Sequence, residues 1–244
     1  MDVAARFEFK YVLTAAERAA LRARFAPRLL PDAVGAPDGR YPVVSLYCDT
    51  PDRRCHWEAW RGVPSRRKLR LRLYGSPDGA SPPACFLEVK HRDGAEGAKR
   101  RVALPLADAL TVLAGGEAEG ADVAARRTLA EIGRLVRDDG FRPACVIRYD
   151  REALRFVDDA GRERLRVTFD EGVRARFDRL VPAPADDACG LPVLPDGLCL
   201  MEIKGAEAVP YELAAWLTAR GIYPRPFSKY SESIRRSAPE TASR

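Results

Sequence analysis

The 244-residue sequence predicts an α+β fold: an eight-stranded antiparallel β-barrel, or tunnel, with a basic lumen and flanking helices. The first observation behind this is the run KLRLRL at 68–73, in which three cations alternate with three leucines. On a strand, such alternation places the charges on one face and the leucines on the other. The second is that similar alternation returns on run after run. The third is that consecutive runs are joined by short, turn-like links, which favour antiparallel pairing.

Eight segments are expected to be strands: 6–13, 43–49, 67–74, 85–92, 99–104, 143–157, 162–170 and 198–204. Turn chemistry separates several of them, as in GSPDGASPP at 75–83 and in the hairpin link DDAG at 158–161.

Helices are expected over 14–30, 105–114, 122–138 and 210–220. The first begins at Thr14 with Glu17 in capping-box spacing, and the last has Pro210 near its start and Gly221 after its end. The Pro-, Asp- and Gly-rich segment 182–197 is expected to be a surface loop. We expect residues 1–236 to form a single domain and residues 237–244 to form a disordered tail.

Composition limits the class of protein. The net charge of +6 is too modest for a nucleic-acid-binding tail, and neither a signal sequence nor a long apolar span is evident. The six cysteines lack C-x-x-C spacing, so they are expected to be reduced and buried. We therefore expect a cytoplasmic protein that does not insert into a membrane. Trp57, Trp60 and Trp216 are expected to pack in the core or against helices, with base stacking as the less favoured alternative.

Strand alternation assigns eleven cations to the inner faces of the barrel: Lys10, Lys68, Arg70, Arg72, Lys90, Lys99, Arg101, Arg148, Arg164, Arg166 and Lys204. Only Glu8, Glu88, Glu202 and Asp170 oppose them. Unpaired ions resist burial, so a highly charged anion is expected to bind there. The inverse arrangement, with an apolar interior and the charges facing solvent, is the alternative that alternation alone leaves open.

Phosphate is the anion that this residue set favours. Arginine forks and lysine point charges match phosphate oxygens, and the few glutamates suit a hard divalent cation, Mn²⁺ or Mg²⁺. The sequence contains neither G-x-x-x-x-G-K nor G-x-G-x-x-G. Phosphate binding is therefore expected to depend on side chains rather than on a glycine-rich loop.

Nine short segments follow one another along the chain: FEFKY at 7–11, SLYCDT at 45–50, KLRLRLY at 68–74, FLEVKHR at 86–92, KRRVAL at 99–104, RYDREAL at 148–154, RVTFD at 166–170, LMEIK at 200–204 and FSKY at 227–230. In this order they resemble the vacuolar transporter chaperone domain of polyphosphate polymerases, within the triphosphate tunnel metalloenzyme superfamily. The sequence departs from the superfamily's E-x-E-x-K signature on the first strand, where Arg6 replaces the first glutamate.

The resemblance implies a tunnel that binds ATP or another nucleoside triphosphate together with inorganic phosphate and polyphosphate. By motif, it assigns phosphate contacts to Lys10, Arg70, Arg72, Lys90, Lys99, Arg151, Arg166 and Lys229, and the metal to Glu202. Glu8 and Glu88 are further metal candidates, and the alternative role for both is salt-bridging that orients the lysines. Within the phosphate-binding set, Lys68, Arg101, Arg148 and Lys204 come from strand alternation. Arg148 and Arg151 are competing candidates, because alternation favours the first and the motif favours the second.

The leading hypothesis is a metal-dependent polyphosphate polymerase that transfers the terminal phosphoryl group of ATP to phosphate or polyphosphate, with Arg70, Arg72, Lys90 and Arg166 as catalytic residues. A triphosphatase of the same superfamily and a non-catalytic polyphosphate- or nucleotide-binding module are the alternatives. Nucleic-acid binding ranks last, because the basic runs alternate with leucine and valine rather than with exposed aromatics.

Overall fold

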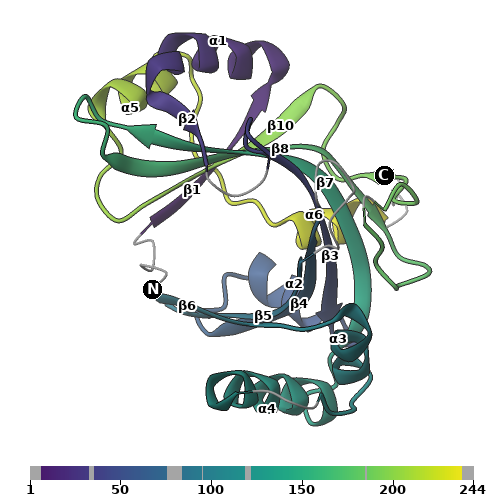
Figure 1. Ribbon diagram of the computed structural model, residues 1–244. Coiled ribbons are helices and arrows are strands. Elements are labelled where there is room, and N and C mark those ends of the chain that lie inside the picture. Colours follow the sequence, from purple (N-terminus) through teal and green to yellow (C-terminus); the bar gives the residue numbers. More distant parts are fainter. Residues whose placement is uncertain are drawn as a thin grey trace, which may run out of the picture.

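The computed structural model describes residues 7–32, 36–75, 84–94, 96–118, 122–184 and 186–237. A single antiparallel sheet dominates it, with strand order β1-β10-β8-β7-β3-β4-β5-β6. Those strands span Phe7–Thr14, Leu198–Gly205, Glu163–Arg176, Arg142–Val157, Arg40–Asp49, Arg66–Tyr74, Ala84–Asp93 and Glu96–Ala103, respectively. Two short strands, β2 (Leu29–Pro31) and β9 (Leu191–Pro192), pair with β7 and β8. Figure 1 shows the sheet curling into a half-barrel around a central opening. The predicted fold class is confirmed.

Apolar side chains on the outer face of the sheet are covered by helices. On one half, Leu69, Leu71 and Leu73 are fully buried in the cluster to which α3 (Leu106–Leu113) and α4 (Val123–Arg137) contribute. On the other half, α1 (Ala15–Phe25) and α5 (Tyr211–Thr218) bury residues such as Leu13 and Met201. The alternation of leucine with arginine therefore places the apolar residues outside and the charges inside, and the inverse arrangement is wrong.

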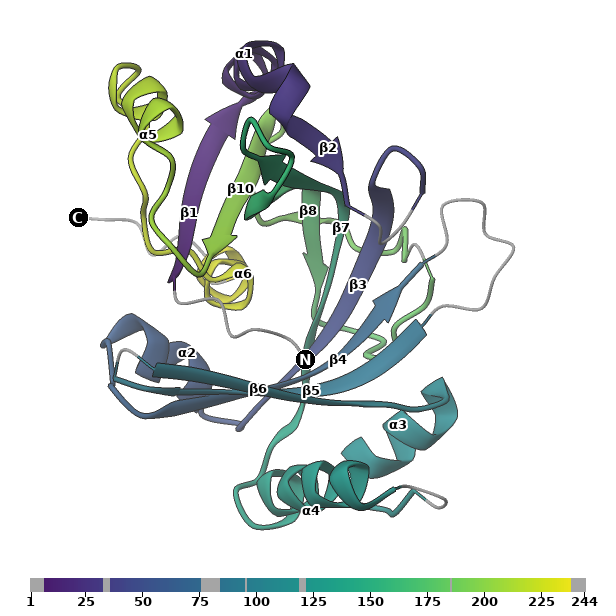
Figure 2. The ribbon, with the colours of Figure 1, turned by 60° about the vertical axis from the view of Figure 1, so that its left-hand side comes forward.

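The sheet is not closed by strand pairing among the described residues, because its pairing path ends at β1 and β6. Other contacts bridge the two ends. Glu8 on β1 forms an ion pair with Lys90 on β5, with a carboxylate-to-ammonium distance of 3.4 Å. The backbone N–H of Arg225 donates to the carbonyl of Lys10 at 2.8 Å, so the segment after α5 lies along β1. Figure 2 shows this segment leading from α5 to α6 (Lys229–Ser237).

The helix starts follow the sequence signals closely, but the predicted helix over 14–30 is too long: α1 ends at Phe25, a single 3-10 turn with a proline covers Ala26–Arg28, and Leu29–Pro31 form β2. Thr14 caps α1 in a complete capping box with Glu17, and α5 begins after Pro210. Gly221, with φ of 68°, reverses the chain after α5 in a conformation that favours glycine. Segment 182–197 is the predicted loop, interrupted only by β9 among its described residues. All six cysteines are buried and free.

Two helices are absent from the prediction: α2 (Arg54–Trp60) and α6. The expectation that three tryptophans pack is confirmed for Trp216, which is 9% exposed, and is wrong for Trp57 and Trp60, which are 44% and 72% exposed. Position on α2 explains the error, since its buried residue is Cys55, which faces the sheet. Arg6, most of the predicted turn at 75–83 and nearly all of the predicted tail at 237–244 lie outside the described residues.

Candidate anion-binding site

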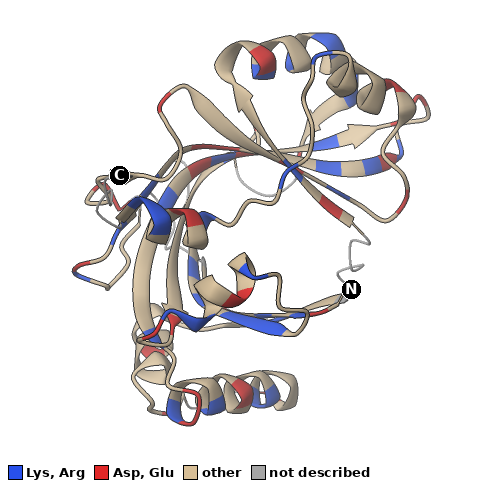
Figure 3. Cartoon of the chain, turned by 180° about the vertical axis from the view of Figure 1, so that it is seen from behind, with Lys and Arg blue, Asp and Glu red and all other residues tan. Residues whose placement is uncertain are grey.

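Charged side chains line the inner face of the half-barrel, as the alternation predicts. Figure 3 shows basic residues on strands of both halves of the sheet, around the opening. Strand register brings them together, since Arg70 on β4 lies opposite Glu88 on β5, which in turn lies opposite Arg101 on β6. Lys68 and Lys99 flank Lys90 in the same way on the neighbouring strands. Three adjacent strands thus present one continuous basic surface.

Glu88 is at the centre of what we call the arginine wall, the inner face of β3 to β6, which carries Arg70, Arg72 and Lys99. Its side chain is 1% exposed, and its carboxylate lies 2.6 Å from an Arg70 guanidinium nitrogen, 3.1 Å from the Lys99 ammonium and 4.0 Å from Arg72. Burial raises the pKa of Glu88, but Arg70 and Arg72 outweigh it and hold this pKa well below its usual range. Arg72 also donates to the Ser45 hydroxyl at 3.1 Å. The carboxylate is therefore committed to orienting these cations.

Glu8 and Glu202 form a second acidic centre on the opposite wall. They are diagonal neighbours on β1 and β10, because Glu8 pairs with Lys204 and Lys10 pairs with Glu202. Both carboxylates lie close to the same two ammonium groups. The Lys10 ammonium is 3.2 Å from Glu8 and 3.9 Å from Glu202. The Lys204 ammonium is 3.9 Å from Glu8 and 3.1 Å from Glu202. Burial raises the pKa of Glu8, but Lys204 and Lys10 outweigh it and lower this pKa to about 2. Both groups are ionised at neutral pH.

Lys229, the first residue of α6, enters the lumen between the strands. Its ammonium lies 2.6 Å from Asp170 and 3.2 Å from Glu202, and 4.6 Å from the centroid of the Tyr149 ring. Arg151 binds the two oxygens of Asp170 through two nitrogens, at 2.7 and 2.8 Å. Despite opposing burial, Asp170 and Glu202 raise the pKa of Lys229. Lys229 lies outside the predicted strands and was assigned by the motif alone. It forms one charged cluster with Arg151, Asp170 and Glu202.

The structure separates the two competing arginines of β7. Arg151 is buried in the interior with Asp170. Arg148 instead lies 2.7 Å from the exposed carboxylate of Asp150. These two side chains lie on one face of β7, and Tyr149 and Arg151 lie on the other. The pairing register of β7 with β8 shifts between Arg148 and Asp150. The extra residue of this bulge lies on β8, where three steps from Arg174 to Glu171 oppose two from Arg148 to Asp150. Strand β7 itself alternates regularly, so Arg148, three residues before Arg151, lies on its other face.

The remaining predicted residues occupy different parts of the surface. Arg166 donates to Asp32 at 2.8 Å and lies 3.5 Å from the Tyr41 hydroxyl. Arg164 pairs with Glu207 at 2.6 Å, outside the charged cluster. Lys68 donates to the Ser228 hydroxyl at 3.2 Å, beside the start of α6. Arg101 lies over the Phe86 ring, 4.9 Å from its centroid.

The inner charges do not balance. Glu8, Glu88, Asp170 and Glu202 face ten cations, namely Lys10, Lys68, Arg70, Arg72, Lys90, Lys99, Arg101, Arg151, Lys204 and Lys229. Among the described residues, no carboxylate forms an ion pair with Lys68 or Arg101. Burial lowers the pKa of Lys68 to about 8, which reflects the cost of holding an ammonium there. An anionic ligand would relieve this excess.

Two hydroxyls that the sequence reasoning missed also lie on this face. Tyr149 and Thr168 are 0% and 3% exposed, and neither hydroxyl has a hydrogen-bond partner within the described protein. Tyr149 lies beneath Lys229, and Thr168 is opposite Glu202 in the strand register. Buried hydroxyls are normally satisfied, so these two mark an unusual spot on the inner face, where each oxygen is enclosed by the protein. The only sequence signal was the position of Tyr149, two residues before Arg151.

The described residues contain no group of three or more His, Cys, Asp or Glu side chains placed to hold a metal ion. The neighbouring carboxylates of Glu8 and Glu202 form a two-residue donor set. Such a set fits a hard divalent cation that takes its remaining oxygen ligands from phosphate and water. All three glutamates have three cations within 4 Å, but Glu88 fits this role less well because no second carboxylate of the described strands lies opposite or diagonal to it in the register.

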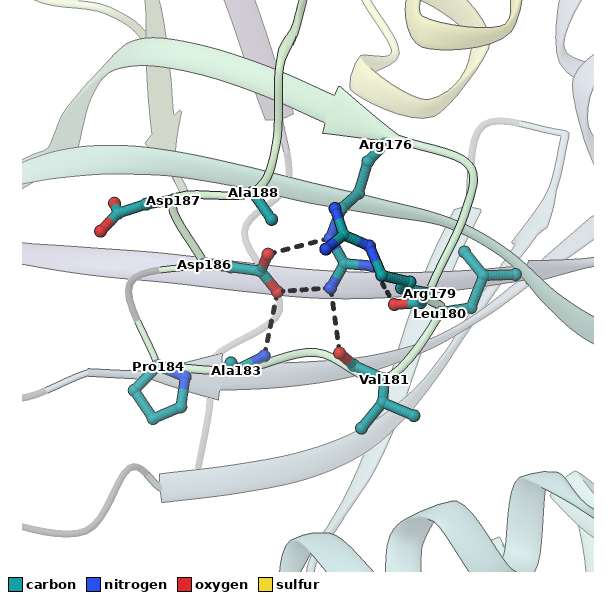
Figure 4. Close-up of a pocket in the computed structure, with 9 residues that line it drawn as sticks. All are labelled: Arg176, Arg179, Leu180, Val181, Ala183, Pro184, Asp186, Asp187 and Ala188. Atoms are coloured by element: carbon teal, nitrogen blue, oxygen red, sulfur yellow. Dashed lines mark hydrogen bonds and ion pairs between the residues drawn. The ribbon is translucent and has the colours of Figure 1, made fainter.

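A surface hollow formed by the loop after β8 is a different kind of feature. It is lined by residues such as Arg176, Val181 and Asp186, as Figure 4 shows. Arg176 donates to both oxygens of Asp186 at 2.9 Å, and to the backbone carbonyls of Asp178 and Val181 at 2.6 and 2.9 Å. With its guanidinium satisfied by the loop itself, Arg176 anchors the loop rather than awaiting a ligand.

Comparison with known proteins gave two findings. A family model described as the VTC domain matches residues 5–237. A crystal structure of a candidate adenylate cyclase from Bacillus halodurans is similar in fold, with a TM-score of 0.50 and 14% sequence identity over 91% of this chain and 92% of that one. A search of curated proteins gave no match. None of the described helices is both long and apolar enough to cross a bilayer.

Proposed function

The chain belongs to the VTC domain family, as its nine ordered segments predicted, and we propose that it is a metal-dependent polyphosphate polymerase. In this proposal it transfers the terminal phosphoryl group of ATP to inorganic phosphate or to a growing polyphosphate. The observation that carries the proposal is the excess of cations on the inner face of the half-barrel. A chain of phosphates is a ligand whose charges repeat along its length, as the basic residues do across these strands.

The two walls have different roles in the proposed reaction. Phosphoryl transfer requires in-line alignment of the nucleophile and neutralisation of the equatorial oxygens, and it needs no covalent intermediate with the protein. Arg70 and Arg72 would grip the transferring phosphate, oriented by Glu88. Arg151 and Lys229 would hold the adjacent phosphates. Lys10, Lys90 and Lys99 would orient the donor and the product.

Arg166 has a more peripheral place in this scheme than the sequence alone implied. Its guanidinium already binds Asp32, and its side chain is more exposed than those of Arg72 and Arg151. We assign it to contacts with phosphates at one end of the lumen rather than to the transferring group. Lys68, Arg101 and Lys204 complete the phosphate-binding surface.

Glu202 and Glu8 would hold the divalent ion, Mn²⁺ or Mg²⁺. When bound, such an ion neutralises charge on phosphate oxygens and fixes their orientation. The chain's own contribution is to keep both carboxylates ionised, which the shared ammonium groups of Lys10 and Lys204 achieve.

The proposal is tested by incubating purified protein with ATP and Mn²⁺, with and without a short polyphosphate primer, and resolving the products on a gel. Long-chain polyphosphate together with ADP is the expected result. Orthophosphate and ADP alone would identify a triphosphatase. Binding of tripolyphosphate without any turnover of ATP would identify a binding module.

A further inference from the structure

The helix α2 exposes two tryptophans on a protein that otherwise buries most of its large aromatic side chains. Trp60 is 72% exposed and Trp57 is 44% exposed. Their rings meet edge to face, with centroids 5.9 Å apart and planes at 81°. The guanidinium of Arg61 lies 5.8 Å from the centroid of the Trp57 ring. Exposing this much indole surface to water is unfavourable, so the pair is a candidate binding surface.

The position of α2 connects the tryptophan pair to the charged lumen. Figure 1 shows α2 and α6 together in the opening of the half-barrel, and α2 packs against both α6 and β4. Arg53, immediately before α2, lies 3.4 Å from the hydroxyl of Tyr230 on α6. Tyr230 in turn stacks on Tyr47 in the arginine wall, with ring centroids 5.5 Å apart. Helix α2 therefore lies at the same end of the lumen as Lys68 and Lys229.

The chemistry of the lumen leaves the nucleoside part of a nucleotide to be bound elsewhere. Ten cations suit phosphates, whereas a purine base is neutral and offers a flat aromatic face. Stacking of a base on an aromatic side chain contributes about 1–3 kcal/mol, and an arginine next to the ring adds a cation–π contact. Indole gives the largest stacking surface among the side chains.

We propose that Trp57 and Trp60 form a stacking platform for the purine base of a nucleoside triphosphate whose phosphates occupy the lumen. This inference rests on the proposed function, since it assumes that the phosphate donor is a nucleotide. The platform recognises the aromatic face of the base rather than its hydrogen-bonding edge, so discrimination between purines is expected to be weak.

A second aromatic group provides the rival location. Tyr41, Tyr74 and Phe86 contact one another on the inner face, with ring centroids 5.9 and 5.8 Å apart, at the end of the lumen that includes Arg101 and Arg166. Tyr41 is 4% exposed, and the three rings are packed edge to face against each other. They offer less free ring surface than Trp60, which is why we place the base at α2.

The test compares the affinities of ATP and inorganic tripolyphosphate by calorimetry, without turnover, for the wild type and for Trp57→Ala/Trp60→Ala. Both side chains are exposed, so the double variant should fold. We expect it to bind ATP about tenfold more weakly and tripolyphosphate within about twofold of the wild type. Tyr211→Ala, which removes an 84% exposed aromatic from α5, is the matched control and should change neither affinity.

Fluorescence gives an independent readout, because the chain contains only three tryptophans. In a Trp216→Phe background the signal comes from Trp57 and Trp60 alone. ATP should quench it strongly, and tripolyphosphate should leave it nearly unchanged.

Three results would overturn the inference: equal affinities of the double variant and wild type for ATP, an equal loss for both ligands, or a selective loss of ATP affinity in Phe86→Ala. These outcomes are separate from the fate of the proposed function. A protein that makes no polyphosphate but shows the ATP-selective loss retains the platform. An active polymerase that is indifferent to both tryptophans lacks it.

Discussion

Buried arginines occur in two regions of this molecule, and they behave in opposite ways. In the loop after β8, Arg176 binds both oxygens of Asp186 and several backbone carbonyls, so charge and hydrogen bonds balance within the protein. On the arginine wall, Arg70, Arg72 and Lys99 share the single carboxylate of Glu88. The comparison separates a buried arginine whose hydrogen bonds the protein itself satisfies from a surface that carries more cations than its carboxylates balance. We take the second, not burial or a nearby hollow, as the mark of the candidate site.

The difference leads to opposite expectations for substitution. Removing a satisfied arginine leaves a buried carboxylate without its partner, which is costly to stability. Removing one of several cations that compete for one carboxylate relieves repulsion and leaves the carboxylate paired. Substitutions in the two regions therefore test this contrast.

Arg72→Ala is expected to reduce polyphosphate synthesis at least about 100-fold, the range seen when one transition-state donor is removed. The fold should survive, because Glu88 keeps Arg70 and Lys99 as partners. Product gels measure the activity, and thermal unfolding without ligand measures stability. A variant that melts far below the wild type would show that Arg72 is a structural ion-pair partner, and the contrast with Arg176 would fail.

Arg176→Ala is expected to destabilise the protein by about 3 kcal/mol, since it leaves the buried Asp186 carboxylate without its two-nitrogen partner. Urea unfolding measures this loss. Tripolyphosphate affinity, measured where the variant is still folded, should equal that of the wild type. Arg176→Lys keeps the positive charge but loses the two-nitrogen contact with Asp186, so we expect a smaller loss of stability than in Arg176→Ala. Weakened tripolyphosphate binding with unchanged stability would reverse the assigned roles of the two regions.

Glu202→Gln and Glu88→Gln distinguish the two acidic centres inside the lumen. Glu202→Gln should abolish metal-dependent turnover while retaining or increasing polyphosphate affinity, because it removes a hard-cation ligand and one negative charge. Glu88→Gln should leave the Mn²⁺ concentration for half-maximal activity unchanged, since Glu88 orients arginines instead. Titrating activity with Mn²⁺ and affinity by calorimetry checks both variants. Normal metal dependence in Glu202→Gln would make Glu8 the leading metal ligand.

The smallest expected effect is a pH dependence of binding. Burial lowers the pKa of Lys68 to about 8, so the free protein loses this charge as the pH rises through 8, and tripolyphosphate affinity should fall several-fold between pH 7 and 9. For folding the sign is opposite: charged Lys68 destabilises the native state below pH 8, and raising the pH relieves this penalty. Calorimetry at several pH values measures the affinity.

Tyr47 titrates in the same range and needs its own control. Although burial opposes it, Arg70 and Arg72 lower the pKa of Tyr47 to about 8. Lys68→Met should flatten the pH dependence, whereas Tyr47→Phe should retain most of it. A full pH dependence in Lys68→Met would assign the effect to Tyr47.

The sequence predicted the fold well because alternation is a property of the strands themselves. The run at 68–73 fixed which face of β4 meets the helices, and the same reasoning held for β1, β5, β6 and β10. It failed at β7, because charged residues occur on both faces of this strand, Arg148 and Asp150 on one and Arg151 on the other, and the motif selected the buried Arg151. Both faces of β7 also bury apolar side chains, Val146 and Phe156 on one face and Ile147 and Ala153 on the other, so alternation alone does not identify the inner face.

The rest of the site depends on contacts between distant parts of the chain. Lys229 reaches Asp170 and Glu202 only because α6 packs inside the curved sheet. The exposure of Trp57 and Trp60 depends on which face of the short α2 meets β4, which hydrophobicity alone predicted wrongly. The partnerless hydroxyl of Tyr149 is evident only from three-dimensional packing.

The central claim, that the lumen holds excess positive charge for a phosphate chain, is tested most directly by thermal unfolding of the wild type in rising concentrations of inorganic tripolyphosphate. A ligand that binds only the native state stabilises it by about 2.7 kcal/mol at one hundred times its Kd. We predict an unfolding temperature that climbs steadily with tripolyphosphate in the wild type and in Arg176→Lys, and that barely moves in Arg72→Ala. If tripolyphosphate does not raise the unfolding temperature of the wild type, the claim is wrong. It is also wrong if Arg176→Lys and Arg72→Ala reduce this rise equally.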